Sequence, residues 1–460
     1  MIGDRWGLSP DKICWVFNAI IKPIMTYACV TWAPRLLDNK SLMTRLDRAG
    51  NLTLLMASGA RRTSSQEVLH TLFSFLPASL ELEKTSLLQA LRLKSLEHWP
   101  NLQVDHTVRK SLEPCCYIID RILNKIFTNY NCHTNDLTKP TNISQKNYTL
   151  EINGNDMVPL DPINYIITTY TDGSKHSDDS TGYGVAIFID KETRMTENYT
   201  MKQHHTVFQC EAHALLRASI LLNDILSSPS LSEHRVIIYS DSQALIKALS
   251  NPYSISKTII DLHNSLNDTA STHLITIEWV PGHKDHYGNE LADKLANIRA
   301  VVPNPTLSTN QPNIPHTFFK NKVHKYTNDK KNKRWNNSNI SKNTKELVSA
   351  IVNRNLQGQH LFKLGFDVLK PLTRLITGHN NLNHFQNKID FTTAPYCSFC
   401  EDDVHETAMH LICDCEYFAR TRMEKFGEDP ITIDQLMRLT SLTKKKDLTV
   451  LLDFIGDYEL

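Results

Sequence analysis

The feature that most constrains this chain is a set of apolar, β-branched runs that end on acids. "NYIITTYTDGSK" begins at Asn164 and passes Asp172 where the run ends, and "RVIIYSD" ends at Asp241 in the same way. Runs of Val, Ile, Thr and Tyr bounded by breakers are typical of β-strands. A carboxylate leaving a buried strand is costly unless a cation or a hydrogen-bond donor meets it. Taken singly, Asp172 fits an ordinary Asp-Gly turn, and Asp241 fits a helix cap.

Two further acids lie in predicted helices that follow such strands. Glu211 stands early in "FQCEAHALLRASILLNDIL", and Asp293 lies in "HYGNELADKLANIRAV", after the strand "HLITIEWVPGH". A first-turn acid and an exposed helical acid are the simpler interpretations of each alone. Together, strand-end acids become neighbours if their strands run side by side in the same direction, and helical acids can lean over that edge. Four carboxylates at one point repel strongly unless cations lie between them.

Hard divalent ions with oxygen ligands, Mg²⁺ or Mn²⁺, are the natural occupants of such a site. Two such ions a few ångströms apart can activate a water and stabilise the leaving oxygen of a phosphodiester. The pattern therefore predicts a two-metal site for phosphodiester chemistry.

The order of strand-like and helical runs predicts the fold class. Three strand-like segments come in succession and two more alternate with helices, which is typical of an α/β domain with a mixed five-stranded sheet and flanking helices. A helical region precedes this domain and a basic helical region follows it. The predicted boundaries are 1–127 for the helical region, 128–162 for a linker, 163–302 for the α/β domain, 303–315 for a proline-rich linker and 316–460 for the basic region.

A second group of metal-binding residue types lies within 397–415. Its Cys-x₂-Cys turn followed by a His and a Cys is a standard way to build a closed tetrahedral zinc site. We predict a small zinc-knuckle-like module with one structural Zn²⁺ bound by Cys397, Cys400, His410 and Cys415. Cys413 and His405 are alternative ligands for the last places, and buried packing cysteines are the alternative for the whole group.

Charge and cysteine usage bound the partners and the compartment. The formal net charge is only +1, but thirteen Lys or Arg stand against three acids between His316 and Phe385. A solvated helix face or linker explains most such runs, and a nucleic-acid-binding surface is the sharper alternative. The other cysteines form no disulfide framework, and the N-terminus lacks an apolar signal segment. We expect an intracellular protein of the nucleus or cytoplasm that is neither secreted nor in a membrane; the pattern leaves the oligomeric state open.

The segments "YTDGSK", "FQCEAHALL", "YSDSQALIKAL" and "WVPGHKDHYGNELADKLA" resemble, in order and spacing, the four signature segments of type-I ribonuclease H domains. Their order and spacing also resemble the version found at the C-terminus of non-LTR retrotransposon polyproteins. The resemblance implies that Asp172, Glu211, Asp241 and Asp293 are the metal-binding acids. It also implies that His283 assists proton transfer or product release, and that Glu290 is a weaker candidate for positioning a water.

By this resemblance, the domain is a metal-dependent endonuclease that cuts the RNA strand of RNA–DNA hybrids with two Mg²⁺ or Mn²⁺ ions. "VFQCE" stands where cellular members carry an Asn-rich segment that contacts the hybrid, and Gln209 is the candidate to replace it. The alternatives are another nuclease of the same fold and a catalytically decayed nucleic-acid-binding protein.

The flanks resemble the same elements. "WGLSPDKICWVFNAIIKPIMTYACVTWAP" is similar to the helical stretch that follows a reverse transcriptase palm, and similar cysteine clusters follow the ribonuclease H domain there. Residues 1–162 contain no Tyr/Phe-x-Asp-Asp strand turn, so we expect no polymerase activity. The sequence is thus interpreted as part of a retroelement polyprotein whose basic C-terminal region helps hold nucleic acid.

Overall fold

The computed structural model of this chain describes residues 7–37, 39–100, 113–128, 130, 135–151, 166–176, 181–202, 204–228, 231, 234–282, 286–298, 313–353, 358–432 and 435. They form two compact units. The first, here called the helical unit, contains Met1–Leu87, Gln103–Ile122 and His324–Leu460, and the second, here called the sheet unit, contains Leu88–Leu102 and Leu123–Val323. The division falls within helices α6 (Ala78–Ser95) and α12 (His316–Asn336).

The sheet unit is built on a mixed six-stranded sheet in the order β2-β8-β6-β3-β4-β5. The strands are β2 (Thr149–Glu151), β3 (Ile166–Lys175), β4 (Thr181–Ile189), β5 (Glu192–Met201), β6 (Arg235–Ser240) and β8 (Ile275–Trp279). β3 pairs with β4 in antiparallel and with β6 in parallel orientation, and β6 is parallel to β8. The structure agrees with the predicted α/β class and mixed sheet, but the sheet has six strands where the sequence predicted five.

The sixth strand, β2, lies inside the segment predicted to be a linker. It runs parallel to β8, and Leu150 is its one large apolar residue. Thr149 Oγ1 donates to Thr276 Oγ1 over 3.0 Å, and the neighbouring Tyr148 is buried against His263. Three residues without hydrophobic alternation carry no strand signal in the sequence; the free edge of β8 supplies the partner that such a segment needs. A second short strand of that segment, β1 (Leu137–Asn142), pairs with β7 (Tyr253–Ser256).

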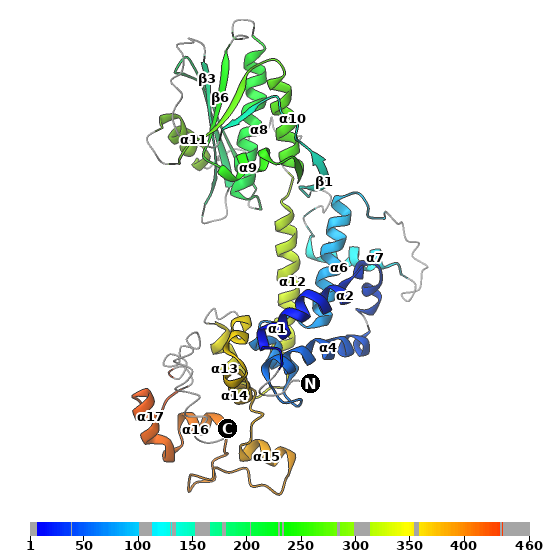
Figure 1. Cartoon of the computed structure of the whole chain (residues 1–460), viewed down its shortest axis with the longest axis vertical. Helices are drawn as coiled ribbons and strands as arrows, with labels where there is room; N and C mark the ends of the chain where they lie inside the picture. The colour runs from blue at the N-terminus through cyan, green and yellow to red at the C-terminus, as the bar shows by residue number, and fades with distance from the viewer. Residues whose placement is uncertain are drawn as a thin grey trace. The chain divides into compact units, whose positions relative to one another are not determined.

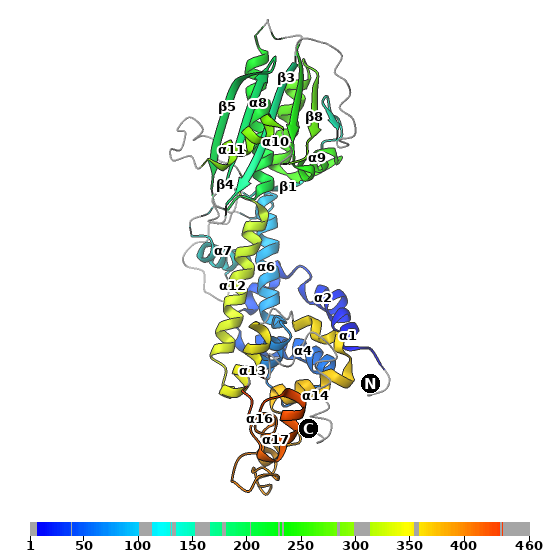
Figure 2. The same ribbon diagram turned by 90° about the vertical axis from the view of Figure 1, so that its left-hand side faces the viewer.

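Helices cover both faces of this sheet (Figure 1). α8 (Val207–Leu226), α9 (Gln243–Ser250) and α10 (Lys257–Ala270) bury their apolar sides against alternate residues of the central strands, and α11 (Tyr287–Asn297) packs on β3 and β4. Figure 2 shows the same sheet turned toward the viewer. The core on the α8 side includes Ile167, Val185, Ile187, Val236, Ile238, Ile275 and Ile277. Alternating burial in the first half of β3 and the pairing of β3 with β6 fix their register, and with it the level at which Asp172 and Asp241 lie.

The helical unit joins both flanks of the chain in one core. Its N-terminal elements are α1 (Pro10–Val16), the π-helical turn Phe17–Ile21, α2 (Lys22–Thr26), α3 (Cys29–Trp32), the 3₁₀ turn Ala33–Leu36, α4 (Lys40–Ser58), α5 (Gln66–Leu72), part of α6, and the first part of α7 (Cys115–Ile126). Its C-terminal elements are most of α12, then α13 (Lys342–Asn353), the 3₁₀ segment Gly358–Leu364, α14 (Phe366–Thr377), α15 (Asn383–Ile389), α16 (Ala408–Cys413), the 3₁₀ turn Glu416–Phe418 and α17 (Ala419–Phe426).

The regions that the sequence predicts as separate flanks, 1–127 and 316–460, therefore do not pack separately. Phe73 stacks on Phe362 with ring centroids 4.5 Å apart, and one hydrophobic cluster extends from Ile13 through Leu69 to Leu411. Short amphipathic helices cannot enclose a core by themselves, so each flank supplies the apolar surface that the other buries. The predicted 303–315 linker lies mostly outside the described residues.

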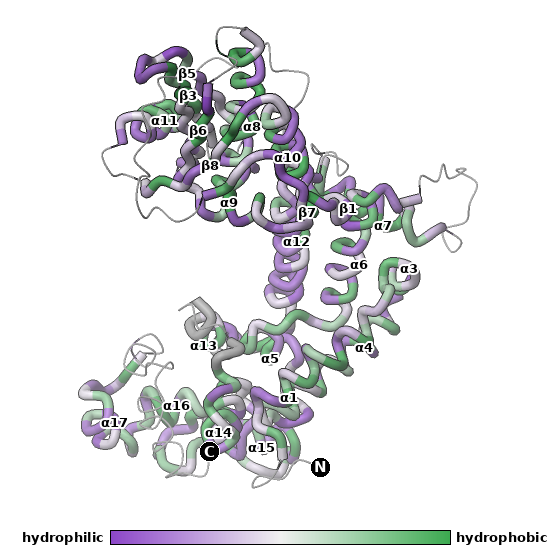
Figure 3. Tube along the Cα trace, turned by 45° about the horizontal axis from the view of Figure 1, so that its top comes forward, coloured by the Kyte–Doolittle hydropathy of each residue, from purple (hydrophilic) through white to green (hydrophobic). Residues whose placement is uncertain are grey.

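The basic run of α12 is partly engaged inside the helical unit. Lys330 Nζ lies 2.6 Å from Glu83 Oε1, and Arg334 Nη1 lies 2.9 Å from Asp47 Oδ2, so these two cations neutralise acids of the N-terminal helices. Figure 3 shows α12 as a predominantly hydrophilic helix. The predicted solvated or phosphate-facing role therefore applies only to the remaining cations of this helix, of which Lys320, Lys322, Lys325 and Lys333 are exposed.

Among the described residues, no single helix has the length and apolar character needed to cross a membrane. Pro10–Thr26 and Cys29–Leu36 meet that criterion only when taken together, with a bend of 44° between them.

Candidate active site and metal cluster

Asp241 directly follows β6, as predicted, whereas Asp172 lies within β3, because β3 continues to Lys175 through its pairing with β4. The last paired residues of β3 and β6 are Thr171 and Ser240, so Asp172 and Asp241 follow side by side as β6 ends. Trp279 Nε1 donates to the Asp241 backbone carbonyl over 3.0 Å and fixes the chain at that point. The parallel pairing of two strands thus brings together two acids that are 69 residues apart (241 − 172).

Glu211 reaches the same point from the second turn of α8. A Cβ built on Gly173 would lie 2.4 Å from the backbone nitrogen of Glu211, so only glycine lets this helix approach β3 so closely. Oxygens of Asp172, Glu211 and Asp241 all lie within 4.8 Å of one another. The structure therefore assembles three of the four predicted acids in one cluster.

The environment of Glu211 disfavours its charged form. Burial is the main cause that raises the pKa of Glu211 well above its usual value, and the charges of Asp172 and Asp241 raise it further; a hydrogen bond from the Gly173 backbone opposes them. Its side chain is 5% exposed, and Oε2 has no hydrogen-bond partner among the described residues. A buried carboxylate oxygen without a partner, facing two other carboxylates, fits a cation-binding position.

Asp293 is not part of this three-acid cluster. Its helix, α11, packs closely on β4: a Cβ built on Gly184 would lie 2.3 Å from the carbonyl oxygen of Ala292, so this approach requires glycine. Gly184 is also the residue of β4 that pairs with Asp172. Asp293 Oδ1 instead accepts from Asn297 Nδ2 over 2.9 Å, and Ser174 donates to Asn297 Oδ1. Asp293 thus stays a predicted ligand, and Asn297 is a polar neighbour that sequence reasoning missed, although its spacing of four residues from Asp293 on a helix signals contact.

Three further residues, which the sequence proposed as auxiliary site residues, are not seen in contact with the three-acid cluster in the part of the chain that the structure describes. His283 lies outside the described residues, and Glu290 is exposed in the first turn of α11. Gln209 is buried and its Nε2 donates to the Asn313 backbone carbonyl over 3.1 Å. The proposed contact of Gln209 with a hybrid stays a prediction.

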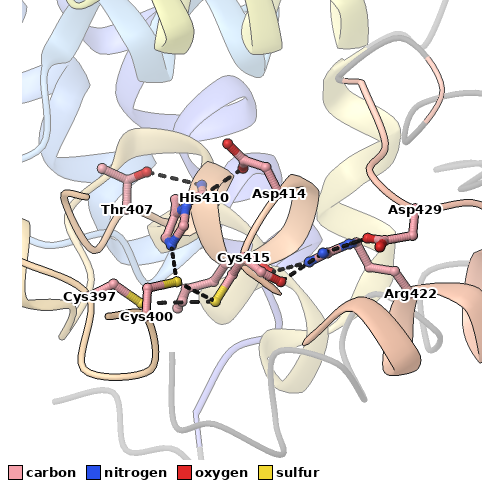
Figure 4. Close-up of polar contacts among 9 residues, drawn as sticks. Cys397, Cys400, Thr407, His410, Asp414, Cys415, Arg422 and Asp429 are labelled. Atoms are coloured by element: carbon pink, nitrogen blue, oxygen red, sulfur yellow. Dashed lines mark hydrogen bonds and ion pairs between the residues drawn. The ribbon is translucent and has the colours of Figure 1, made fainter. Parts of the chain in front are cut away.

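A second cluster of metal-ligand types lies in the helical unit (Figure 4). One ligand atom from each of Cys397, Cys400, His410 and Cys415 lies within 4.8 Å of the others. Cys400 Sγ is 3.3 Å from His410 Nε2 and 3.4 Å from Cys415 Sγ, and Cys397 Sγ is 3.9 Å from Cys415 Sγ. The alternatives Cys413 and His405 do not join this group.

The two later ligands, His410 and Cys415, do not share one helix. α16 is capped by Thr407, whose Oγ1 accepts from the His410 backbone N–H, and it ends at Cys413. Cys415 lies beyond the helix, and its N–H donates to the His410 carbonyl over 2.8 Å. Arg422, 1% exposed, donates to the Cys415 carbonyl over 2.7 Å and pairs with Asp429, which anchors this turn.

Comparisons with known proteins give the sheet unit its relatives. The sequence model of the RNase H family matches residues 164–300. Curated proteins described as ribonuclease H from Jannaschia sp. (strain CCS1) and from Pseudomonas fluorescens strains Pf-5 and Pf0-1 are each 49% identical to this chain over 37 residues, which is 8% of this chain. The match spans about a quarter of the length of these relatives (24–25%).

Two solved structures match over 28% of this chain. RNase H1 from the halophilic archaeon Halobacterium salinarum NRC-1 is 21% identical, with 94% of that chain covered and a TM-score of 0.24. The N-terminal RNase H domain of a Mycobacterium tuberculosis protein, solved as a fusion with maltose binding protein, is 20% identical, with 95% covered and a TM-score of 0.23. The match to the RNase H family model thus covers residues 164–300, which include β3 to β6, β8 and α8 to α11.

Proposed function

We propose that this chain hydrolyses the RNA strand of RNA–DNA hybrids, with two Mg²⁺ or Mn²⁺ ions held by Asp172, Glu211, Asp241 and Asp293. The single observation that carries the proposal is the convergence of three carboxylates within 4.8 Å of one another, on a domain of the ribonuclease H family. All of their donor atoms are oxygens, the ligands that hard divalent ions prefer. When bound, such ions supply an activated water and stabilise charge on the leaving oxygen.

The residues of this chain have distinct tasks in that proposal. Gly173 lets Glu211 approach, and Trp279 holds the Asp241 backbone, so the acids are positioned before metal arrives. Burial and the acidic neighbours raise the pKa of Glu211, and a bound cation would favour its charged form. His283 is proposed to assist proton transfer or product release. RNA is distinguished from DNA through the 2′-hydroxyls that line the wide minor groove.

For the cysteine cluster we propose one structural Zn²⁺ held by Cys397, Cys400, His410 and Cys415. A tetrahedral ion with Zn–S bonds of about 2.3 Å places its sulfur ligands about 3.8 Å apart. The sulfur–sulfur distances of 3.4 and 3.9 Å bracket that separation. Cys413 is buried, and it does not join the group of four ligand atoms, which suits a packing residue better than a ligand. Together with the exposed cations of α12, this module is proposed to help hold nucleic acid in a retroelement polyprotein.

The test is hydrolysis of a hybrid duplex labelled separately on each strand. The wild-type chain is expected to cut only the RNA strand, to require Mg²⁺ or Mn²⁺, and to stop in EDTA. Asp241→Asn should abolish cutting while hybrid binding persists. Binding without cutting by a folded, metal-loaded wild-type chain would instead favour the decayed nucleic-acid-binding protein, and cutting of both strands of duplex DNA would favour another nuclease of this fold.

A further inference from the structure

We propose that a cationic cavity in the helical unit is a binding site for a phosphate monoester. The cavity has a volume of about 240 Å³ and is lined by residues from the π-helical turn and α2, from α5–α6 and from α12. All of these residues belong to the helical unit, so the site is built within one compact body. It is separate from the carboxylate cluster, and the proposal is independent of ribonuclease activity.

The cavity is lined by more positively charged than negatively charged side chains. Lys22, Lys84 and Lys331 line it together with one carboxylate, that of Glu81. Glu81 Oε1 lies 2.8 Å from Lys22 Nζ, and its Oε2 lies 2.7 Å from Lys84 Nζ, so a single negative charge bridges two lysines. Counting these four ionic groups, three positive charges and one negative charge leave an excess of two positive charges.

These charges are also withdrawn from water. The side chains of Lys22, Lys84 and Glu81 are 32%, 20% and 12% exposed. Lys331 is half-buried and forms no direct ion pair among the described residues; burial lowers the pKa of its ammonium group, and the charge of Glu67 only partly opposes this. Cations concentrated in a recess with low dielectric walls attract anions more strongly than the same cations on an open surface.

The rest of the lining narrows the class of ligand. Asn18 and Asn328 offer amide donors, whereas Phe17 and Phe75, with ring centroids 5.2 Å apart, contribute to an apolar wall. Three ammonium groups and two amides match the acceptor-only oxygens of a phosphoryl group. An excess of two positive charges is matched by the dianion of a phosphate monoester, whereas an internal phosphodiester carries one negative charge. The ligand is thus a terminal phosphate, carried by a nucleic-acid strand end, a mononucleotide or free phosphate.

The experiment uses the full chain with Asp172→Asn, so that oligonucleotides are not cut. Titration calorimetry with inorganic phosphate and with a mononucleotide 5′-phosphate is combined with fluorescence anisotropy of one oligodeoxynucleotide bearing either a 5′-phosphate or a 5′-hydroxyl. Lys331→Gln is expected to weaken binding of the phosphate-bearing ligands by about tenfold or more, because it removes a charged hydrogen-bond donor. Glu81→Gln is expected to tighten it, because it raises the positive excess of the cavity.

Opposite signs for these two variants separate anion binding from a structural effect, since loss of structure weakens binding in both. Lys40→Gln, at an exposed lysine of α4 that belongs to the same unit and does not line the cavity, is the matched control and should leave phosphate binding unchanged. Preference for the phosphorylated oligonucleotide assigns the site to strand ends, and binding of the small ligands alone assigns it to free nucleotides or phosphate. Lack of any phosphate binding, or binding that Lys331→Gln leaves intact, would overturn the proposal.

Discussion

Replacement of Asp172 by Asn tests the carboxylate cluster through stability as well as activity. Asp172 is 6% exposed, and its carboxylate lies within 4.8 Å of those of Glu211 and Asp241. In the metal-free site the carboxylates of Asp172 and Asp241 repel each other, and the charge of each also raises the pKa of Glu211. Two unit charges at such a separation repel by about 3 kcal/mol at the effective dielectric constant of protein sites. Since Asp241 is only half-buried, we expect Asp172→Asn to stabilise the metal-free sheet unit by about 1–2 kcal/mol.

With metal bound, we expect the wild-type chain to be more stable than Asp172→Asn. A ligand at a hundred times its dissociation constant stabilises the folded state by about 2.7 kcal/mol, and only the wild-type chain should gain this fully. The free energy of unfolding is measured by urea denaturation with and without Mg²⁺. Hydrogen exchange of the β3 and β6 amides then reports the local stability of the strands that carry the site. Asp268→Asn, an exposed acid of α10 in the same unit, is the matched control and should respond to Mg²⁺ as the wild type does. A metal-free Asp172→Asn variant that is clearly less stable than wild type, or one that keeps full Mg²⁺ stabilisation and full cleavage, would refute the reasoning.

Three further predictions address other residues. Asn297→Ala removes the donor to Asp293 and should lower the cleavage rate by about tenfold and raise the Mg²⁺ concentration required, with hybrid affinity unchanged; an unchanged metal titration would argue against this positioning role. Elemental analysis should find one Zn²⁺ per chain, lost in Cys397→Ser, and chelation should increase hydrogen exchange of residues 390–420 while sparing the sheet unit; a well-folded chain without stoichiometric zinc would contradict it. Burial lowers the pKa of His70 to about 4 from 6.5, so the unfolded chain binds the extra proton first and the helical unit should lose stability as pH falls from about 6.5 to 4, by about 3 kcal/mol in all. His70→Leu should flatten this part of the stability–pH curve, and an equally steep decline in the variant would assign the acid sensitivity to other groups.

The sequence by itself determined the local features of both candidate sites. Apolar, β-branched runs placed Asp172 and Asp241 late in strand-forming segments because strand propensity and burial are properties of short segments, whereas the continuation of β3 to Lys175 depends on its pairing with β4. The Cys-x₂-Cys turn likewise brought Cys397 and Cys400 together by short-range geometry. In both cases the site residue lies within a few positions of the sequence pattern that predicts its local structure.

Only the tertiary structure decided which distant segments meet. Strand β2 carries one large apolar residue, and it became a strand because the edge of β8 was available for pairing. The two flanks share a core because neither can bury its apolar helix faces alone. The packing of the two flanks also brings Lys330 to Glu83, so this lysine forms an ion pair within the unit. Such contacts depend on surfaces that lie hundreds of residues apart in the chain, and one-dimensional periodicity carries no information about how those surfaces complement one another.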